Sequence, residues 1–157
     1  MSRFDNIYEY DNSLAGAGLR IGIVMSRFNL PVCEGLLSAC VTELKRLGVA
    51  DSDMVIANVP GALEIPGAIA LADASMRFDG FVALGCVLRG ETSHYETVAN
   101  ESARGIMELT LQGVCVGNGI DHLYRERPQV GAGGEPMGSR QPVPRPVGRD
   151  HRGSVER

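Results

Sequence analysis

Between residues 19 and 120, short continuous apolar runs alternate with segments that have a helical repeat. The apolar runs are rich in β-branched residues, which is typical of buried strands. In the segments between them, apolar residues recur every three to four positions and form one stripe of an amphipathic helix. The pattern predicts strands at residues 19–28, 54–59, 81–88 and 114–120, and helices at residues 31–47, 64–76 and 94–111.

The order of these elements predicts the fold class. Strands that are apolar at nearly every position belong to parallel sheets, which are covered on both faces. Because crossovers between parallel strands are right-handed, alternating strands and helices wind into an open sheet between two helical layers. We therefore predict an α/β fold with three layers: a doubly wound, flavodoxin-like, parallel four-stranded sheet with helices on both faces. Ligands in such folds bind at the carboxyl ends of the strands.

The two ends of the chain differ from this central part. Residues 1–18 form a predicted N-terminal arm that is acidic and lacks the apolar core of a signal peptide, so we expect a cytoplasmic protein. Residues 121–157 contain five of the eight prolines, seven arginines and six glycines, with few large apolar residues. Such a segment buries too little apolar area to offset its ordering entropy, so we predict a disordered tail. The α/β domain is expected at residues 19–120.

Composition excludes several classes of function. The net charge of −4 does not suit a nucleic-acid surface, which needs a basic patch. No apolar run approaches the roughly 20 residues that span a bilayer. The cysteines form no C-x-x-C pair and lie in apolar contexts, which favours buried thiols over disulfides or a metal site. They are Cys33, Cys40, Cys86 and Cys115.

The loop after the third predicted strand carries the most chemistry. Ser93 and Glu96 have the spacing of a capping box, which predicts a helix N-terminus here. Free N–H groups and the positive end of the helix dipole make such a terminus an anion site, to which Thr92 adds a hydroxyl. His94, in the first turn, could act as a general base and acid. Alternatively, Ser93 only caps the helix and His94 is structural or merely exposed.

Two further loops offer ligand contacts. After the second predicted strand, Gly61 permits close approach of a ligand to the backbone, and Glu64 could accept hydrogen bonds from hydroxyls or amines. The alternative is an ordinary turn with an acidic residue at a helix start. After the first strand, Phe28 could lie flat on a planar ring, or it could be a core residue. The chain contains no P-loop, nucleophile elbow or spaced metal-ligand cluster.

Taken together, four segments resemble the lumazine synthase family. They are residues 27–29 (RFN), 59–66 (VPGALEIP), 84–95 (LGCVLRGETSHY) and 100–101 (NE). The resemblance covers residues 19–120, about two-thirds of the chain. It implies condensation of 5-amino-6-(D-ribitylamino)uracil with 3,4-dihydroxy-2-butanone 4-phosphate to 6,7-dimethyl-8-ribityllumazine, with release of phosphate and water. It also implies that the reaction needs no metal or organic cofactor.

The resemblance assigns roles by position. Phe28 would stack on the uracil ring, Glu91 and Thr92 would line the phosphate site, and His94 would shuttle protons. Further contacts to the aminouracil or its ribityl chain would come from Ala62, Leu63, Glu64, Cys86, Val87 and Leu88.

The resemblance also implies a homo-oligomer, a pentamer or a multiple of it, with active sites between subunits and Asn118 supplied by the neighbour. Association with riboflavin synthase is a further expectation. After Ile120, the family's phosphate-binding arginine and terminal helix are not found, as a shifted reading frame in the gene would explain. An alternative function is therefore a lumazine-binding or shell-forming relative with impaired catalysis.

Overall fold

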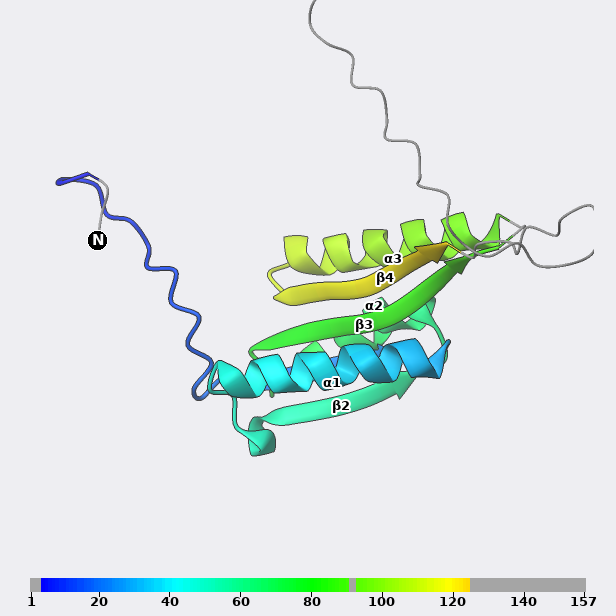
Figure 1. Cartoon of the computed structure of the whole chain (residues 1–157). Coiled ribbons are helices and arrows are strands. Elements are labelled where there is room, and N and C mark those ends of the chain that lie inside the picture. The colour runs from blue at the N-terminus through cyan, green and yellow to red at the C-terminus, as the bar shows by residue number, and fades with distance from the viewer. Residues whose placement is uncertain (1–3, 91–92, 125–157) are drawn as a thin grey trace, which may run out of the picture. The chain divides into compact units, whose positions relative to one another are not determined.

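The computed structural model describes residues 4–90 and 93–124. It contains one sheet of four parallel strands in the order β2-β1-β3-β4, shown in Figure 1. The strands are β1 (Ile21–Ser26), β2 (Met54–Val59), β3 (Gly80–Arg89) and β4 (Val116–Tyr124). The helices are α1 (Leu30–Arg46), α2 (Ile65–Asp73) and α3 (His94–Leu111), with short 3-10 turns η1 (Asp51–Asp53) and η2 (Ala62–Glu64).

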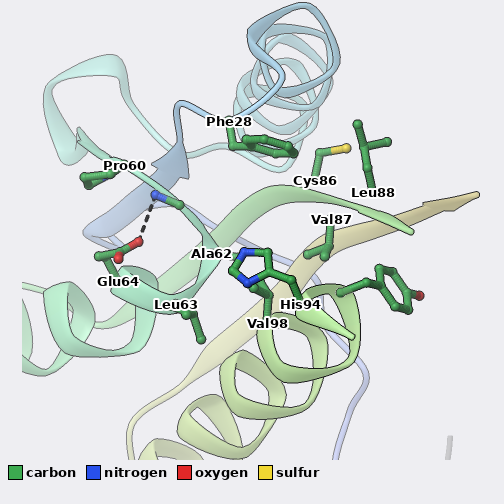
Figure 2. Close-up of a pocket in the computed structure, with 12 residues that line it drawn as sticks. Phe28, Pro60, Ala62, Leu63, Glu64, Cys86, Val87, Leu88, His94 and Val98 are labelled. Atoms are coloured by element: carbon green, nitrogen blue, oxygen red, sulfur yellow. Dashed lines mark hydrogen bonds between the residues drawn. The ribbon is translucent and has the colours of Figure 1, made fainter. Parts of the chain in front are cut away.

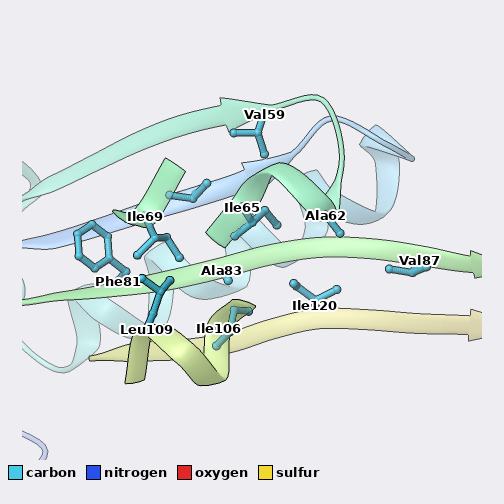
Figure 3. Packing of buried hydrophobic residues seen from close by; sticks show 11 residues of the cluster. Val59, Ala62, Ile65, Ile69, Phe81, Ala83, Val87, Ile106, Leu109 and Ile120 are labelled. Carbon is cyan, nitrogen blue, oxygen red and sulfur yellow. The ribbon is translucent and has the colours of Figure 1, made fainter. Parts of the chain in front are cut away.

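Helices cover both faces of the sheet, as predicted. Side chains alternate between the two faces of a strand, and in β1 Ile23 and Met25 pack with α1, whereas Val24 packs with α2 and α3. The α2–α3 side holds the larger buried cluster (Figure 3), built around Ile65, Ile69, Ile106 and Leu109. The doubly wound, flavodoxin-like class predicted from the hydrophobic pattern is therefore confirmed.

The boundaries of several elements differ from the predicted ones. The predictions for β2 and α3 match the observed bounds, whereas α2 is shorter and is preceded by η2. β4 continues to Tyr124 because its backbone pairs with β3 up to Arg89. Residues 121–124, predicted to start the tail, therefore belong to the strand, while residues 125–157 lie outside the described residues. Within the described part, none of the helices has the length and apolar content needed to cross a membrane.

Candidate functional site

A cleft of about 320 Å³ lies at the carboxyl ends of the central strands. Figure 2 shows Phe28, Glu64 and His94 around it, each contributed by a different loop of the sheet edge. The described residues that line it are Phe28, Pro60, Gly61, Ala62, Leu63, Glu64, Cys86, Val87, Leu88, His94, Tyr95 and Val98. The three loops predicted to carry chemistry thus meet in one cavity, which is the placement expected for parallel strands whose carboxyl ends share an edge.

Phe28 lies two residues after the end of β1 and is half-exposed, so it is not a core residue. Its N–H donates to the hydroxyl of Ser26 at 3.1 Å, and its carbonyl accepts from the thiol of Cys33 at 3.2 Å. Asn29, at the N-cap of α1, adopts a left-handed conformation with φ 56°. Because of this sharp turn, α1 begins at Leu30, two residues after Phe28. The aromatic ring of Phe28 is left on the wall of the cleft.

Glu64 ends the η2 turn, and its carboxylate accepts a hydrogen bond from the N–H of Gly61 at 2.9 Å. This contact is local, yet it orients the carboxylate along the rim of the cleft. Ala62 is buried beneath it, and Leu63 is exposed at 42%. The turn therefore anchors itself through Ala62 and presents one apolar and one acidic side chain to the cavity.

The wall between these loops is the end of β3. Cys86 and Val87 are buried, and Leu88 is half-buried. The pairing of β1 with β3 ends at Leu84, whereas the pairing of β3 with β4 continues to Arg89. Beyond Leu84, the side of β3 that faces β1 no longer pairs with that strand. Its main-chain N–H and C=O groups are therefore the ones that a ligand in the cleft could bind.

His94 is the first residue of α3, and its side chain lines the cleft. The predicted capping box of Ser93 and Glu96 is wrong. Ser93 has helical dihedrals (φ −70°, ψ 0°) and makes no side-chain cap hydrogen bond, because a capping hydroxyl reaches back to the helix only from an extended residue. A carboxylate oxygen of Glu96 instead lies 3.9 Å from a guanidinium nitrogen of Arg89. The first-turn N–H groups still lack intrahelical acceptors, as at every helix start.

Some predicted residues lie elsewhere. Glu91 and Thr92 fall outside the described residues. Asn118 is exposed on the edge strand β4, where its side chain accepts from the N–H of Ile120 at 3.1 Å, and it does not line the cleft of its own chain. Conversely, Tyr95 and Val98 line the cleft but were not predicted. The spacing of Val98, four residues after His94, places both on one face of α3 and could have indicated it.

The four cysteines are free thiols. Cys33 and Cys86 are buried and Cys40 is half-buried, but Cys115 is exposed, so the prediction of a buried thiol is wrong there. Cys115 directly precedes β4, an edge strand with one open side. Burial raises the pKa of the Cys33, Cys40 and Cys86 thiols. Among the residues that the structure describes, no group of three or more His, Cys, Asp or Glu could hold a metal ion.

A doubly wound α/β domain with an aromatic ring, a carboxylate and an imidazole around one edge cleft has the architecture of a small-molecule enzyme. The sequence profile of the 6,7-dimethyl-8-ribityllumazine synthase family matches residues 18–129. The chain therefore belongs to this family, and the resemblance predicted from the sequence motifs is confirmed. The match also extends past residue 120, where the resemblance was predicted to end.

Individual relatives agree with this assignment. A 6,7-dimethyl-8-ribityllumazine synthase from Nitrosomonas europaea is 57% identical over 121 residues, covering 76% of this chain and 74% of the relative. One from Azoarcus sp. (strain BH72) is 54% identical over 121 residues, covering 76% and 78%. One from Burkholderia multivorans is 54% identical over 115 residues, covering 73% and 67%.

Proposed function

We propose that the cleft at the carboxyl edge of the sheet is where this chain carries out the reaction of its family. The chain is a transferase of riboflavin biosynthesis. It condenses 5-amino-6-(D-ribitylamino)uracil with 3,4-dihydroxy-2-butanone 4-phosphate to 6,7-dimethyl-8-ribityllumazine, releasing phosphate and water. One observation carries the assignment of the site: Phe28, Glu64 and His94, from three separate loops, line the same cavity.

The aminouracil would occupy the side of the cleft formed by β1, η2 and β3. There Phe28 stacks on the planar heterocycle, since an exposed aromatic ring can lie flat on a planar π-system. Glu64 accepts hydrogen bonds from the ribityl hydroxyls through the carboxylate that Gly61 orients. The main-chain groups of residues 86–88 that face the β1 side, where β3 no longer pairs with β1, bind the polar edge of the uracil. Ala62 and Leu63 complete the apolar wall.

The ketose phosphate would lie toward the start of α3. The N-terminus of this 18-residue helix presents the positive end of its dipole, which favours a phosphate group. Glu91 and Thr92, which precede this terminus, keep their proposed place in the phosphate site on the basis of the family motif.

His94 stands between the two proposed subsites and is the proposed proton carrier. The amine must lose a proton as the new C–N bond forms, and the departing oxygen of the carbinol must gain one as water leaves. One imidazole can do both in succession. Holding two substrates together in one cleft removes much of the entropic barrier of a bimolecular condensation, and the steps from imine formation to phosphate loss and ring closure need no electron transfer.

The finer features of the assembly are also proposals. We propose a pentamer or a multiple of it, with Asn118 reaching the site of the neighbouring subunit, a cytoplasmic location, and riboflavin synthase as a partner. Support for the oligomer alone comes from large apolar side chains exposed on the monomer, because apolar patches on a protein surface mark sites of association. They include Val55 and Ile56 on β2, Leu71 on α2, and Met107 and Leu111 on α3.

A turnover assay tests the function. Purified protein is mixed with both substrates, and lumazine absorbance and phosphate release are followed together. We expect both signals to appear at equal rates and His94→Ala to lower kcat by about 100-fold or more, the usual contribution of general acid–base catalysis. His122→Ala is the matched control, because His122 lies on β4 and does not line the cleft. Tight lumazine binding without phosphate release would instead favour the binding or shell-forming relative.

A further inference from the structure

The backbone that carries Phe28 is held by side chains outside the catalytic roles assigned above. Phe28 lies between the last residue of β1 and the first turn of α1, in a segment of only three residues, 27–29. Its N–H and its carbonyl are bound by two different side chains, Ser26 and Cys33, each with no exposed surface. A residue fixed on both sides of its Cα has little freedom to tilt its ring.

Of the two contacts to the Phe28 backbone, the one from Cys33 also joins the turn to helix α1. Cys33 sits in the first turn of α1, and its Sγ lies 3.2 Å from the carbonyl oxygen of Phe28. Burial is the largest of the effects that raise the pKa of this thiol, with the nearby Cys86 second. The group therefore stays protonated and can donate its S–H to the carbonyl. The N–H of Cys33 donates to Asn29 at 3.1 Å, so the same residue holds two successive carbonyls of the turn.

A second thiol holds the other end of this turn. The side-chain amide of Asn29 lies 3.6 Å from the Sγ of Cys86, which is itself buried and lines the cleft. This contact ties the left-handed Asn29 to β3, whose Cys86, Val87 and Leu88 also line the cleft (Figure 2). The turn is thereby fixed both to its own helix and to the strand that faces the proposed heterocycle.

From these contacts we propose that Cys33 is a positioning residue for the aminouracil subsite: its thiol holds the Phe28 carbonyl and so sets the plane of the stacking ring. The inference rests on the proposed stacking role of Phe28. It assigns Cys33 no contact with substrate and no chemical step. Because the contact acts only on the Phe28 turn, its loss weakens binding of the heterocycle and leaves the ketose-phosphate subsite at α3 unchanged.

The test uses the full chain and the fluorescent ligand 6,7-dimethyl-8-ribityllumazine. The chain has no Trp, so ligand fluorescence can be titrated with little protein background. We expect Cys33→Ala to weaken binding about two- to fivefold, the range for a weak hydrogen bond, and Cys33→Ser, which keeps a donor, to restore most of the affinity. In turnover, KM for the aminouracil should rise while KM for the ketose phosphate stays constant. Cys40→Ala, in the same helix and half-buried, is the matched control.

A double-mutant cycle with Phe28→Leu separates positioning from general destabilisation. Phe28→Leu alone should weaken lumazine binding roughly five- to tenfold through loss of stacking, and Cys33→Ala should add nothing in that background. Full additivity, or unchanged affinity in Cys33→Ala, would overturn the positioning role. No effect of Phe28→Leu would instead overturn the stacking role on which it rests. If Cys33→Ala does not fold, Cys33→Val, which also lacks a donor, replaces it in the same cycle.

Discussion

At the scale of single residues, Glu64 combines two tasks, and a pair of substitutions separates the charge of its carboxylate from its capacity to accept hydrogen bonds. Its carboxylate holds the Gly61 N–H at 2.9 Å and lines the cleft. We expect Glu64→Gln, which keeps an amide oxygen as acceptor, to change the aminouracil KM only a few-fold. Glu64→Ala removes both contacts and should raise it about 10- to 100-fold, in line with the loss of the substrate's hydrogen bond to a charged group. Steady-state kinetics with each substrate varied in turn measures this. Equal effects of the two substitutions would contradict it.

The single residues also show where local motifs mislead. The spacing of Ser93 and Glu96 is that of a capping box, yet the box does not form because Ser93 is already helical. The side-chain contact of this type that does form lies in the neighbouring loop, where the N–H of Gly61 donates to the carboxylate of Glu64. The motif predicted the start of α3 correctly. Whether the capping hydrogen bond forms depends on the backbone dihedral angles of the N-cap residue, which are helical at Ser93 and extended at Gly61.

At the scale of elements, the packing of α2 on α3 depends on a glycine. A Cβ on Gly105 would lie 2.8 Å from the ring carbons of Pro66, and the proline ring cannot rotate away. Gly105→Ala should therefore lower the free energy of unfolding by about 1–3 kcal/mol through overpacking, offset by up to about 1 kcal/mol of helix propensity.

Gly35→Ala in α1 is the matched control for this substitution. A Cβ there meets nothing within 4 Å, so helix propensity acts alone and should stabilise the protein by about 1 kcal/mol or less. Thermal unfolding of both variants at one protein concentration measures the difference. A Gly105→Ala variant as stable as Gly35→Ala would contradict the close α2–α3 contact.

A pH-dependent link joins the starts of two strands. The carboxylate of Asp79, just before β3, accepts from the backbone N–H of Arg20, just before β1, at 2.8 Å, and from its guanidinium at 3.3 Å. The side-chain hydrogen bond from Arg20 lowers the pKa of Asp79 below its ordinary value of 3.8. A lowered folded-state pKa contributes stability above the unfolded pKa, and that contribution is lost as pH falls through the folded pKa.

We therefore expect Asp79→Asn to have a lower melting temperature than the parent at pH 7. The gap should close as the pH falls below about 4, where the parent carboxylate also becomes neutral. Melting curves of both proteins from pH 7 to pH 2.5 measure this. A gap of constant size across that range would show that the charge of Asp79 contributes nothing.

At the scale of the whole molecule, the proposed sharing of sites between subunits gives a complementation test. His94 lines the cleft of its own chain, whereas Asn118 lies outside it. If Asn118 acts in the neighbour's cleft, His94→Ala and Asn118→Ala each disable every site of a pure assembly. Mixed assemblies should regain activity, because some sites combine an intact His94 with an intact Asn118 from the next subunit.

The measurement is turnover after co-expression of the two variants, with native mass spectrometry to establish that mixed oligomers have formed. Mixing the separately purified assemblies without subunit exchange is the control and should stay inactive. Mixed oligomers without recovered activity would place Asn118 outside the neighbouring site, and a monomer in native mass spectrometry would contradict the proposed assembly.

The sequence by itself determined the fold class, the family and the edge of the sheet at which the cleft lies, because these depend on local periodicity and on short motifs. Patterns near β2 and α3 even predicted the element bounds, since each run ends at a clear change of period. The pattern failed at the end of β4, where strand pairing follows the backbone of β3 rather than the apolarity of residues 121–124.

Only the tertiary structure decided what the loops do together. It brought Phe28, Glu64 and His94 to one cavity, ended the β1–β3 ladder at Leu84 so that main-chain groups face that cavity, and joined Asn29 to Cys86 across 57 positions of sequence. The physical reason is that such contacts join residues far apart in the chain. Strand order and register set their geometry, and no local repeat encodes it.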